Sequence, residues 1–254
     1  METYKRHGFA SHVIDVQRDI DFVRADEQKL HSGSSTDWWG DIWSLMSGYK
    51  NIITRRYLAD DHAICREYTP KLLNAVQEYF FGDWKQKQKT GDGVIDPEWW
   101  RRLSWMSYYD AALCWGSAIG DWKSLKQLAK YPDERCGRDT LDGPVARWRL
   151  LIDISRHLRG EEVSSAAKAV SKLTGAKWRG TAVLAEALDG INAADAPAAE
   201  EALNRFFALH HKRKKTHDVT DSVSFPGTFM LNLARYRKLN VTLEPKLQLY
   251  HAQL

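Results

Sequence analysis

The sequence predicts an all-α fold of antiparallel helix pairs, arranged as a bundle or a short solenoid-like stack with little or no strand. Apolar residues recur at three- and four-residue spacings along most of the chain, which is the pattern of a helix with one buried face. No run of alternating apolar and polar residues is bounded by the Asn-Gly or Asp-Gly turns of a β-hairpin.

The N-terminal part of the chain predicts three helices. An apolar stripe marks the first helix and consists of Val13, Val16, Ile20, Val23 and Leu30. Residues 34–37 offer N-caps for a second helix, whose apolar positions are Trp38, Trp39, Ile42, Trp43, Met46, Tyr49, Ile53 and Tyr57. Thr69 and Pro70 predict the cap and first residue of a third helix, because proline has no N–H to lose there, and Gly82 ends that helix.

Similar start and stop signals divide the remainder of the chain. Asp96 and Pro97 begin a long aromatic helix that ends near Gly120, and a shorter helix runs from Asp121 to a point before Pro132. Further helices are expected at residues 144–160, 161–173, 177–188, 197–211 and 226–239, and only residues 240–243 look extended. We expect one all-helical domain, 1–254, in which the helices of residues 1–95 pack on a helical body of residues 96–254.

Length and composition fit a globular protein of ordinary size. The chain has 254 residues, of which 43% are hydrophobic and 28% charged, so it can bury a core without a disulfide or a metal. The net charge of +4 is too small to indicate nucleic-acid binding by itself. No apolar run is long enough to cross a membrane, and the first residues lack the apolar core of a secretory signal. Three widely spaced cysteines favour reduced thiols, so we expect a cytoplasmic protein.

Three helix ends share a pattern in which a glycine precedes an acidic residue. The glycines at 82, 120 and 160 are spaced by about 40 residues, a period typical of helix-pair repeats. Glycine also ends many unrelated helices, so a plain bundle remains the alternative. If each turn reverses the chain, acidic residues gather at one edge and lysines lie nearer the other. Helix capping explains part of that pattern, and a partner-binding edge would explain the rest. The candidate binding residues at this edge are Asp83, Trp84, Asp121, Trp122, Glu161 and Glu162.

No recognisable motif marks a catalytic, phosphate-binding or metal-binding site. The chain has no G-x-S-x-G turn and no glycine-rich phosphate loop, and Cys114 lies between apolar residues of an expected helix. His210, His211 and His217 surround the basic run 212–215, whose charge disfavours a divalent metal. We therefore expect no catalytic residue, no metal and no cofactor. The basic run is either a solvated helix end or a contact for an anionic partner.

Tryptophan is the unusual residue in this composition, with 11 copies. Asp37 and Asp41 share one helix face beside several of them, which would suit an acidic aromatic patch. Capping by Asp37 and core packing of the tryptophans is the interpretation we favour. Eleven tryptophans still exceed the usual need of one core, so we expect some of them on a binding surface.

The last third of the chain resembles the immunity protein 49 family. Residues 202–211 (ALNRFFALHH) form a helix with basic and histidine residues, and residues 225–241 (FPGTFMLNLARYRKLNV) follow as an apolar helix that ends in Ala-Arg-x-Arg. Residues 111–113 and 120–129 also fit the helical middle of that family. The resemblance covers roughly Trp105 to Val241.

This resemblance implies a binding protein and no enzyme. Members of the family neutralise a cognate toxin of bacterial polymorphic toxin systems by binding it tightly, and the partner would then be a protein effector in the cytosol. Two other functions stay open on sequence grounds. One is a helical-repeat scaffold or adaptor that binds a protein or peptide, and the other is a nucleic-acid binder that uses residues 212–215.

Overall fold

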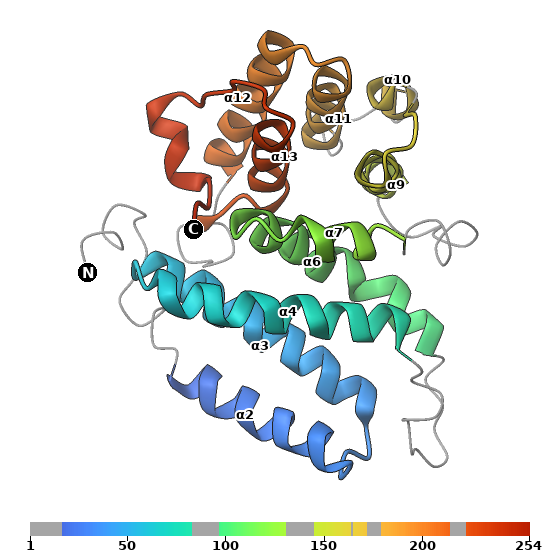
Figure 1. The fold of residues 1–254 in the computed structure, drawn as a ribbon, viewed down its shortest axis with the longest axis vertical. Coiled ribbons are helices and arrows are strands. Elements are labelled where there is room, and N and C mark those ends of the chain that lie inside the picture. The colour runs from blue at the N-terminus through green and yellow to red at the C-terminus, as the bar shows by residue number, and fades with distance from the viewer. Residues whose placement is uncertain (1–16, 83–96, 131–144, 164, 172–178, 214–221) are drawn as a thin grey trace. The chain divides into compact units, whose positions relative to one another are not determined.

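The computed structural model confirms the all-α class. It describes residues 17–82, 97–130, 145–163, 165–171, 179–213 and 222–254, and every regular element within these ranges is a helix (Figure 1). The chain divides into two compact units. Unit 1 comprises Met1–Ala112, Lys215–Ser222 and Leu254, and unit 2 comprises Leu113–Lys214 and Val223–Gln253. Among the described helices, none combines the length and apolar character that a membrane span requires.

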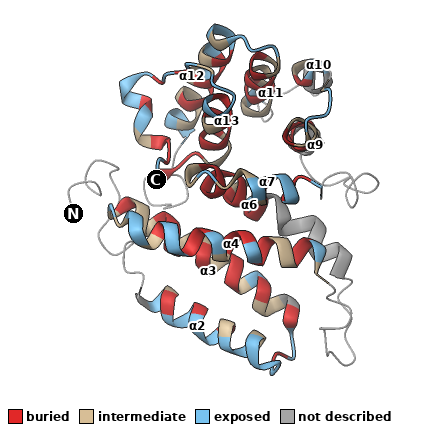
Figure 2. Cartoon of the chain, viewed as in Figure 1, coloured by how far each residue is buried: buried red, intermediate tan, exposed pale blue. Residues whose placement is uncertain are grey.

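Unit 1 is built from consecutive helices that pack side by side. Helix α3 (Trp38–Leu58) contacts both α2 (Gln17–Ser32) and α4 (His62–Phe81), and the buried residues of each helix form a stripe (Figure 2). Val23 of α2 lies so close to Gly48 of α3 that a β-carbon at position 48 would overlap its side chain. The glycine therefore permits the close approach of these two helices.

A partly buried polar contact joins all three of these helices. The hydroxyl of Tyr49 on α3 donates to the Glu27 carboxylate on α2 at 2.7 Å, and the Lys71 ammonium on α4 lies 3.2 Å from the same oxygen. Arg55 of α3 also pairs with Asp19 of α2 at 2.5 Å. Helix α2 is thus held by charged contacts as well as by its apolar stripe.

The prediction that a helix starts at Thr69 and Pro70 is wrong. Helix α4 begins at His62, where the Asp61 carboxylate accepts from the amide of Ile64 at 3.3 Å, and it continues through Pro70. A proline inside a helix costs about 3 kcal/mol. Burial of the residues on both sides offsets this cost, and these are Cys65, Tyr68, Leu72, Leu73 and Val76.

Helix α6 (Pro97–Ala118) begins at the predicted proline and completes the core of unit 1. Its Tyr108 ring meets Trp43 of α3 edge-on, with ring centroids 5.9 Å apart, and its Tyr109 ring meets Phe80 of α4 at the same separation. Trp43 nevertheless keeps 37% of its surface exposed, so it lies at the margin of the core that the apolar stripe predicts.

Unit 2 contains the remaining described helices, and neighbours in sequence are mostly neighbours in space. They are α7 (Trp122–Leu128), α9 (Val145–Arg159), α10 (Ala166–Ser171), α11 (Arg179–Asn192), α12 (Ala196–Arg213), α13 (Phe225–Tyr236) and the 3-10 helix η4 (Pro245–Tyr250). Helix α9 contacts α7, α10 and α11, and α11 contacts α12 and α13 (Figure 1). The largest buried side chains of this core include Trp115, Phe207, Phe229 and Tyr250.

One boundary in unit 2 differs from the prediction because a side chain from a distant segment binds the backbone. Helix α10 starts at Ala166, where its first amides and the Ser165 hydroxyl donate to the Asp189 carboxylate of α11. Residues 240–243, which look extended in the sequence, belong to no helix or strand, and the Thr242 amide donates to Glu200 on α12 at 2.8 Å. Helix η4 follows and has no counterpart among the predicted elements.

The predicted glycine–acid pattern holds at two helix ends. Gly120 and Gly160 have φ of +77° and +78°, and the amide of the following acidic residue donates to the carbonyl five residues before it. This is the hydrogen-bond pattern of the Schellman helix end, in which a left-handed residue satisfies the last carbonyls. Gly82 has φ of −66°, so the third predicted member ends its helix differently.

The same helix end also occurs where no glycine is present. Asp60 and Ala194 have φ of 57° and 55°. The amides of the next residues, Asp61 and Asp195, each donate a hydrogen bond to the carbonyl five residues earlier, at 2.9 and 2.8 Å. Each of these aspartates then accepts an amide of the next helix, as Asp121 does. A left-handed residue followed by an aspartate cap therefore connects consecutive helices at three places, which are α3 to α4, α6 to α7 and α11 to α12.

Candidate protein-binding surface

The sequence-predicted binding residues fall into three turns, two of which the structure describes. Asp83 and Trp84 lie outside the described residues. The second turn contains Asp121 and Trp122 at the start of α7, and the third contains Glu161 and Glu162 after α9. All four of these described residues belong to unit 2.

Asp121 acts as the N-cap of α7. Its carboxylate accepts the Ser124 amide at 3.1 Å, and the side chain is half-buried. This bond satisfies one of the amides that have no partner at a helix start. A partner protein would have to compete with the cap for this carboxylate.

Glu161 is held in a two-point ion pair by its neighbour Arg159. The Nε–Oε1 and Nη2–Oε2 distances are 2.6 and 3.0 Å, and this hydrogen bonding lowers the pKa of Glu161. The guanidinium also donates to the carbonyl of Ala129, which follows α7. Glu162 is exposed and forms no ion pair within the described part of the chain.

The predicted acidic edge is therefore spread along α7 and does not form a single cluster. Asp121 lies at the N-terminal end of that helix, whereas Arg159 ties Glu161 to its C-terminal end. A helix of this length spans about 10 Å. The predicted residues Asp121 and Glu161 consequently flank the helix, and Trp122 lies on it.

Trp122 forms an aromatic stack with Tyr236 at the end of α13. The ring centroids are 4.2 Å apart and the planes are inclined by 22°. The buried Phe229 lies on the interior side of the chain's packing with its ring centroid 6.4 Å from that of Trp122. Tyr236 keeps 43% of its surface exposed, which makes it one of the few large apolar side chains so exposed among the described residues.

One basic side chain contacts this stack, and other basic residues neighbour its two rings in the sequence. The Lys126 ammonium lies 5.9 Å from the Tyr236 ring centroid, within the range of a cation–π contact. Further exposed cations come from the same two segments. We call the following residues the basic–aromatic surface: Trp122, Lys123, Lys126, Arg235, Tyr236 and Arg237.

Sequence reasoning selected Trp122 but missed its cationic neighbours and Tyr236. The two stacked rings are far apart in the chain, and no local pattern pairs them. The only available signal was Tyr236 itself, an aromatic residue within the run Arg235 to Lys238 at a helix end. An aromatic residue among solvent-facing cations is a recognisable binding signature.

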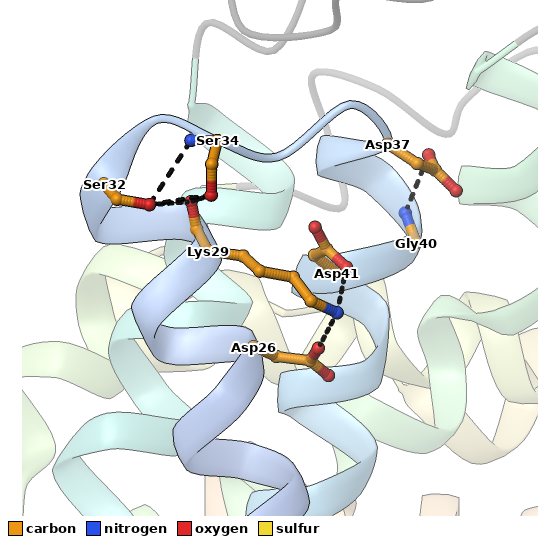
Figure 3. Close-up of polar contacts among 7 residues, drawn as sticks. All are labelled: Asp26, Lys29, Ser32, Ser34, Asp37, Gly40 and Asp41. Atoms are coloured by element: carbon orange, nitrogen blue, oxygen red, sulfur yellow. Dashed lines mark hydrogen bonds and ion pairs between the residues drawn. The ribbon is translucent and has the colours of Figure 1, made fainter.

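The Asp37 and Asp41 region of unit 1 supports the capping interpretation. Asp37 accepts the Gly40 amide at 3.1 Å as the N-cap of α3, and the Lys29 ammonium lies between Asp41 and the buried Asp26 (Figure 3). The corresponding distances are 2.8 Å to Asp26 and 3.7 Å to Asp41. These carboxylates therefore fix the turn between α2 and α3.

The histidines near the basic run have a structural role. His211 lies with its Nδ1 2.7 Å from the Tyr250 hydroxyl, and the His210 ring meets the Tyr250 ring edge-on. Both contacts connect η4 to α12. Lys212 and Arg213 are exposed at the end of α12, while His217 and the rest of the basic run lie outside the described residues. Within the described part of the chain, no group of His, Cys, Asp and Glu could hold a metal ion.

The cysteines within the described ranges are buried thiols. Cys114 is fully buried, as the sequence predicts, and so is Cys65. Burial raises the pKa of Cys65 to about 12, and its thiol lies 3.4 Å from the carbonyl of Ile53. A thiol of this kind is a poor nucleophile because its thiolate is disfavoured.

Comparison with known proteins finds no match for this chain. No family model matches, and neither the curated proteins nor the solved structures contain a significant match.

Proposed function

We propose that the chain is an immunity protein, which neutralises a cognate bacterial toxin in the cytosol by binding it directly and with high affinity. The proposal assigns no catalytic residue and no cofactor. It is supported by the resemblance of residues 105–241 to the immunity protein 49 family, a stretch that supplies both rings of the Trp122–Tyr236 stack.

The observation that carries the proposal is the exposed stack itself. Tryptophan, tyrosine and arginine dominate the energetically important positions of protein interfaces. Here Trp122 and Tyr236 hold each other in place, and the buried Phe229 supports them. Side chains that are already ordered lose little conformational entropy when a partner docks, so this surface suits tight binding.

Co-expression tests this proposal. The product of the gene next to the one encoding this chain is expressed in bacteria, alone and together with the chain. We expect that the neighbouring product arrests growth, that the chain restores growth, and that the two proteins co-purify. Growth arrest without rescue, or rescue without a complex, would reject direct neutralisation.

Two single-residue variants connect this test to the surface. Tyr236→Ala removes the more exposed ring of the stack and should abolish rescue. Phe22→Ala is the matched control, because Phe22 is also an exposed aromatic residue, with 56% of its surface accessible, but belongs to unit 1. Equal rescue by both variants would show that a different surface binds the toxin.

A further inference from the structure

Among the residues that the structure describes, the cations of the basic–aromatic surface pair with no carboxylate. Lys123, Lys126, Arg235 and Arg237 are exposed and form no ion pair within the described part of the chain. Arg159 and Arg205 of the same unit, by contrast, pair with Glu161 and Glu186. Like charges around one apolar stack repel each other in the free protein, and a group of negative charges would relieve that repulsion.

We propose that the basic–aromatic surface docks an acidic segment of the partner protein, whose carboxylates pair with its cations while an apolar side chain packs on Tyr236. This inference rests on the proposed function and specifies the chemistry of the partner. Arginine suits the task because its guanidinium binds a carboxylate through two parallel hydrogen bonds. Charge complementarity of this kind also accelerates association.

Carboxylates at both ends of α7 favour a protein over a nucleic acid. Asp121 lies at the start of this helix, and Glu161 and Glu162 lie in the turn that Arg159 ties to its end. A nucleic-acid strand carries a negative charge at every phosphate and would meet these carboxylates. A folded protein can place acidic side chains opposite the cations and other groups opposite the carboxylates.

The experiment compares two double charge reversals. Lys126→Glu with Arg237→Glu changes the basic–aromatic surface, and Lys212→Glu with Arg213→Glu makes the same charge change at the end of α12. Arg235 is left intact because its positive charge helps to lower the pKa of the buried His251. Circular dichroism verifies that both variants keep their helical content.

Two labelled probes of equal net charge are titrated against each protein. One is a short peptide of glutamates and aspartates around a single tryptophan, and the other is a single-stranded DNA oligonucleotide. We expect the unmodified chain to bind the peptide more tightly than the DNA. The Lys126/Arg237 variant should lose about tenfold in peptide affinity, and the Lys212/Arg213 variant less than about twofold.

Three results would overturn the inference: equal losses in both variants, no loss in the Lys126/Arg237 variant, or tighter binding of the DNA. The same two variants are also tested with the neighbouring gene product. If that protein binds the unmodified chain and the Lys126/Arg237 variant equally well, this inference fails while the proposed function stands. If that protein binds neither, the proposed function fails, and the peptide titration still decides the chemistry of the surface.

Discussion

Backbone strain in this fold is found at residues that have a β-carbon and adopt the left-handed conformation. Asp60, Ala194 and Lys238 have φ of 57°, 55° and 62°, a conformation that costs a residue with a β-carbon about 1–2 kcal/mol. Gly120 and Gly160 adopt the same conformation without this cost. The helix ends therefore offer a direct comparison between strained and relaxed versions of one turn.

Substitution of Ala194 by glycine should stabilise the protein. The side chain of Ala194 is exposed and glycine keeps its backbone hydrogen bond to Ile191, so relief of the backbone strain exceeds the extra entropy that glycine gives the unfolded chain. We expect a gain of about 0.5–1 kcal/mol in the free energy of unfolding, measured by urea denaturation.

The reverse change at Gly120 is the control. A β-carbon there meets no atom within 4 Å, so Gly120→Ala introduces backbone strain and no clash. The free energy of unfolding should fall by about 1–2 kcal/mol. Stabilisation by Gly120→Ala, or destabilisation by Ala194→Gly, would refute the assignment of these helix ends.

The protonation of His251 is strongly coupled to folding. Burial, and to a smaller extent the positive charge of Arg235, lowers the pKa of His251 to about 3. Its Nε2 lies 2.9 Å from the Asn232 side-chain oxygen, and Asn232 also donates to the Ser117 hydroxyl. The imidazole is therefore neutral in the folded protein at neutral pH.

The stability of the protein should decrease as the pH falls through the range from about 6.5 to about 3. In this range the unfolded chain binds a proton at His251 that the folded chain excludes, so the free energy of unfolding rises with pH. His157, whose pKa burial also lowers, acts in the same direction. Urea denaturation at several pH values measures the slope, and His251→Gln should reduce it.

An NMR titration of the His251 imidazole in the folded, unmodified protein provides an independent check. The resonance should not titrate between about pH 7 and about pH 5. A midpoint near the ordinary value for histidine would show that the residue is accessible to water, and the burial described here would be wrong.

Some features of single residues could be predicted from the sequence and others could not. The caps Asp37 and Asp121 were predictable because a cap acts within three residues of its own position. The exposure of Trp43 and the stacking of Tyr236 on Trp122 were not, because each depends on a helix that is distant in the chain. Local patterns predict which side of a helix is apolar, and they do not predict which neighbour covers it.

At the scale of whole helices, polar contacts decide where several elements begin and how they dock. The start of α10 depends on Asp189 of α11, and the start of α4 was missed because burial outweighs the cost of Pro70. Existence and approximate length were predictable for most helices from their periodicity. Boundaries set by a distant carboxylate or by burial carry no local signal.

Glu27 should be the main polar contribution to the docking of α2. Its carboxylate accepts from Tyr49 and pairs with Lys71, and burial with this hydrogen bond raises the pKa of Tyr49. Glu27→Ala leaves the Tyr49 hydroxyl and the Lys71 ammonium without their partner. We expect a loss of about 1–3 kcal/mol in the free energy of unfolding by urea denaturation.

Two companion variants make this test specific. Glu27→Gln keeps an acceptor for the Tyr49 hydroxyl and removes the charge, so its loss should be smaller than that of the alanine variant. Gln28→Ala changes the adjacent exposed residue of α2 and should shift stability by less than about 0.5 kcal/mol. Similar losses at positions 27 and 28 would contradict the role assigned to Glu27.

At the scale of the whole molecule, the two units show different features at their surfaces. The described charged residues of unit 1 that face α2 are joined in ion pairs between helices, such as Asp19 with Arg55 and Glu27 with Lys71. Unit 2 exposes the basic–aromatic surface, whose cations form no ion pair with another described residue. We therefore propose that unit 2 recognises the partner.

The most direct test is the affinity of the chain for the neighbouring gene product, measured by isothermal titration calorimetry for the unmodified chain, Tyr236→Ala and Phe22→Ala. We expect Tyr236→Ala to lose at least about 2 kcal/mol of binding free energy and Phe22→Ala to bind like the unmodified chain. Unchanged affinity for Tyr236→Ala, with a loss for Phe22→Ala, would contradict the assignment of recognition to unit 2.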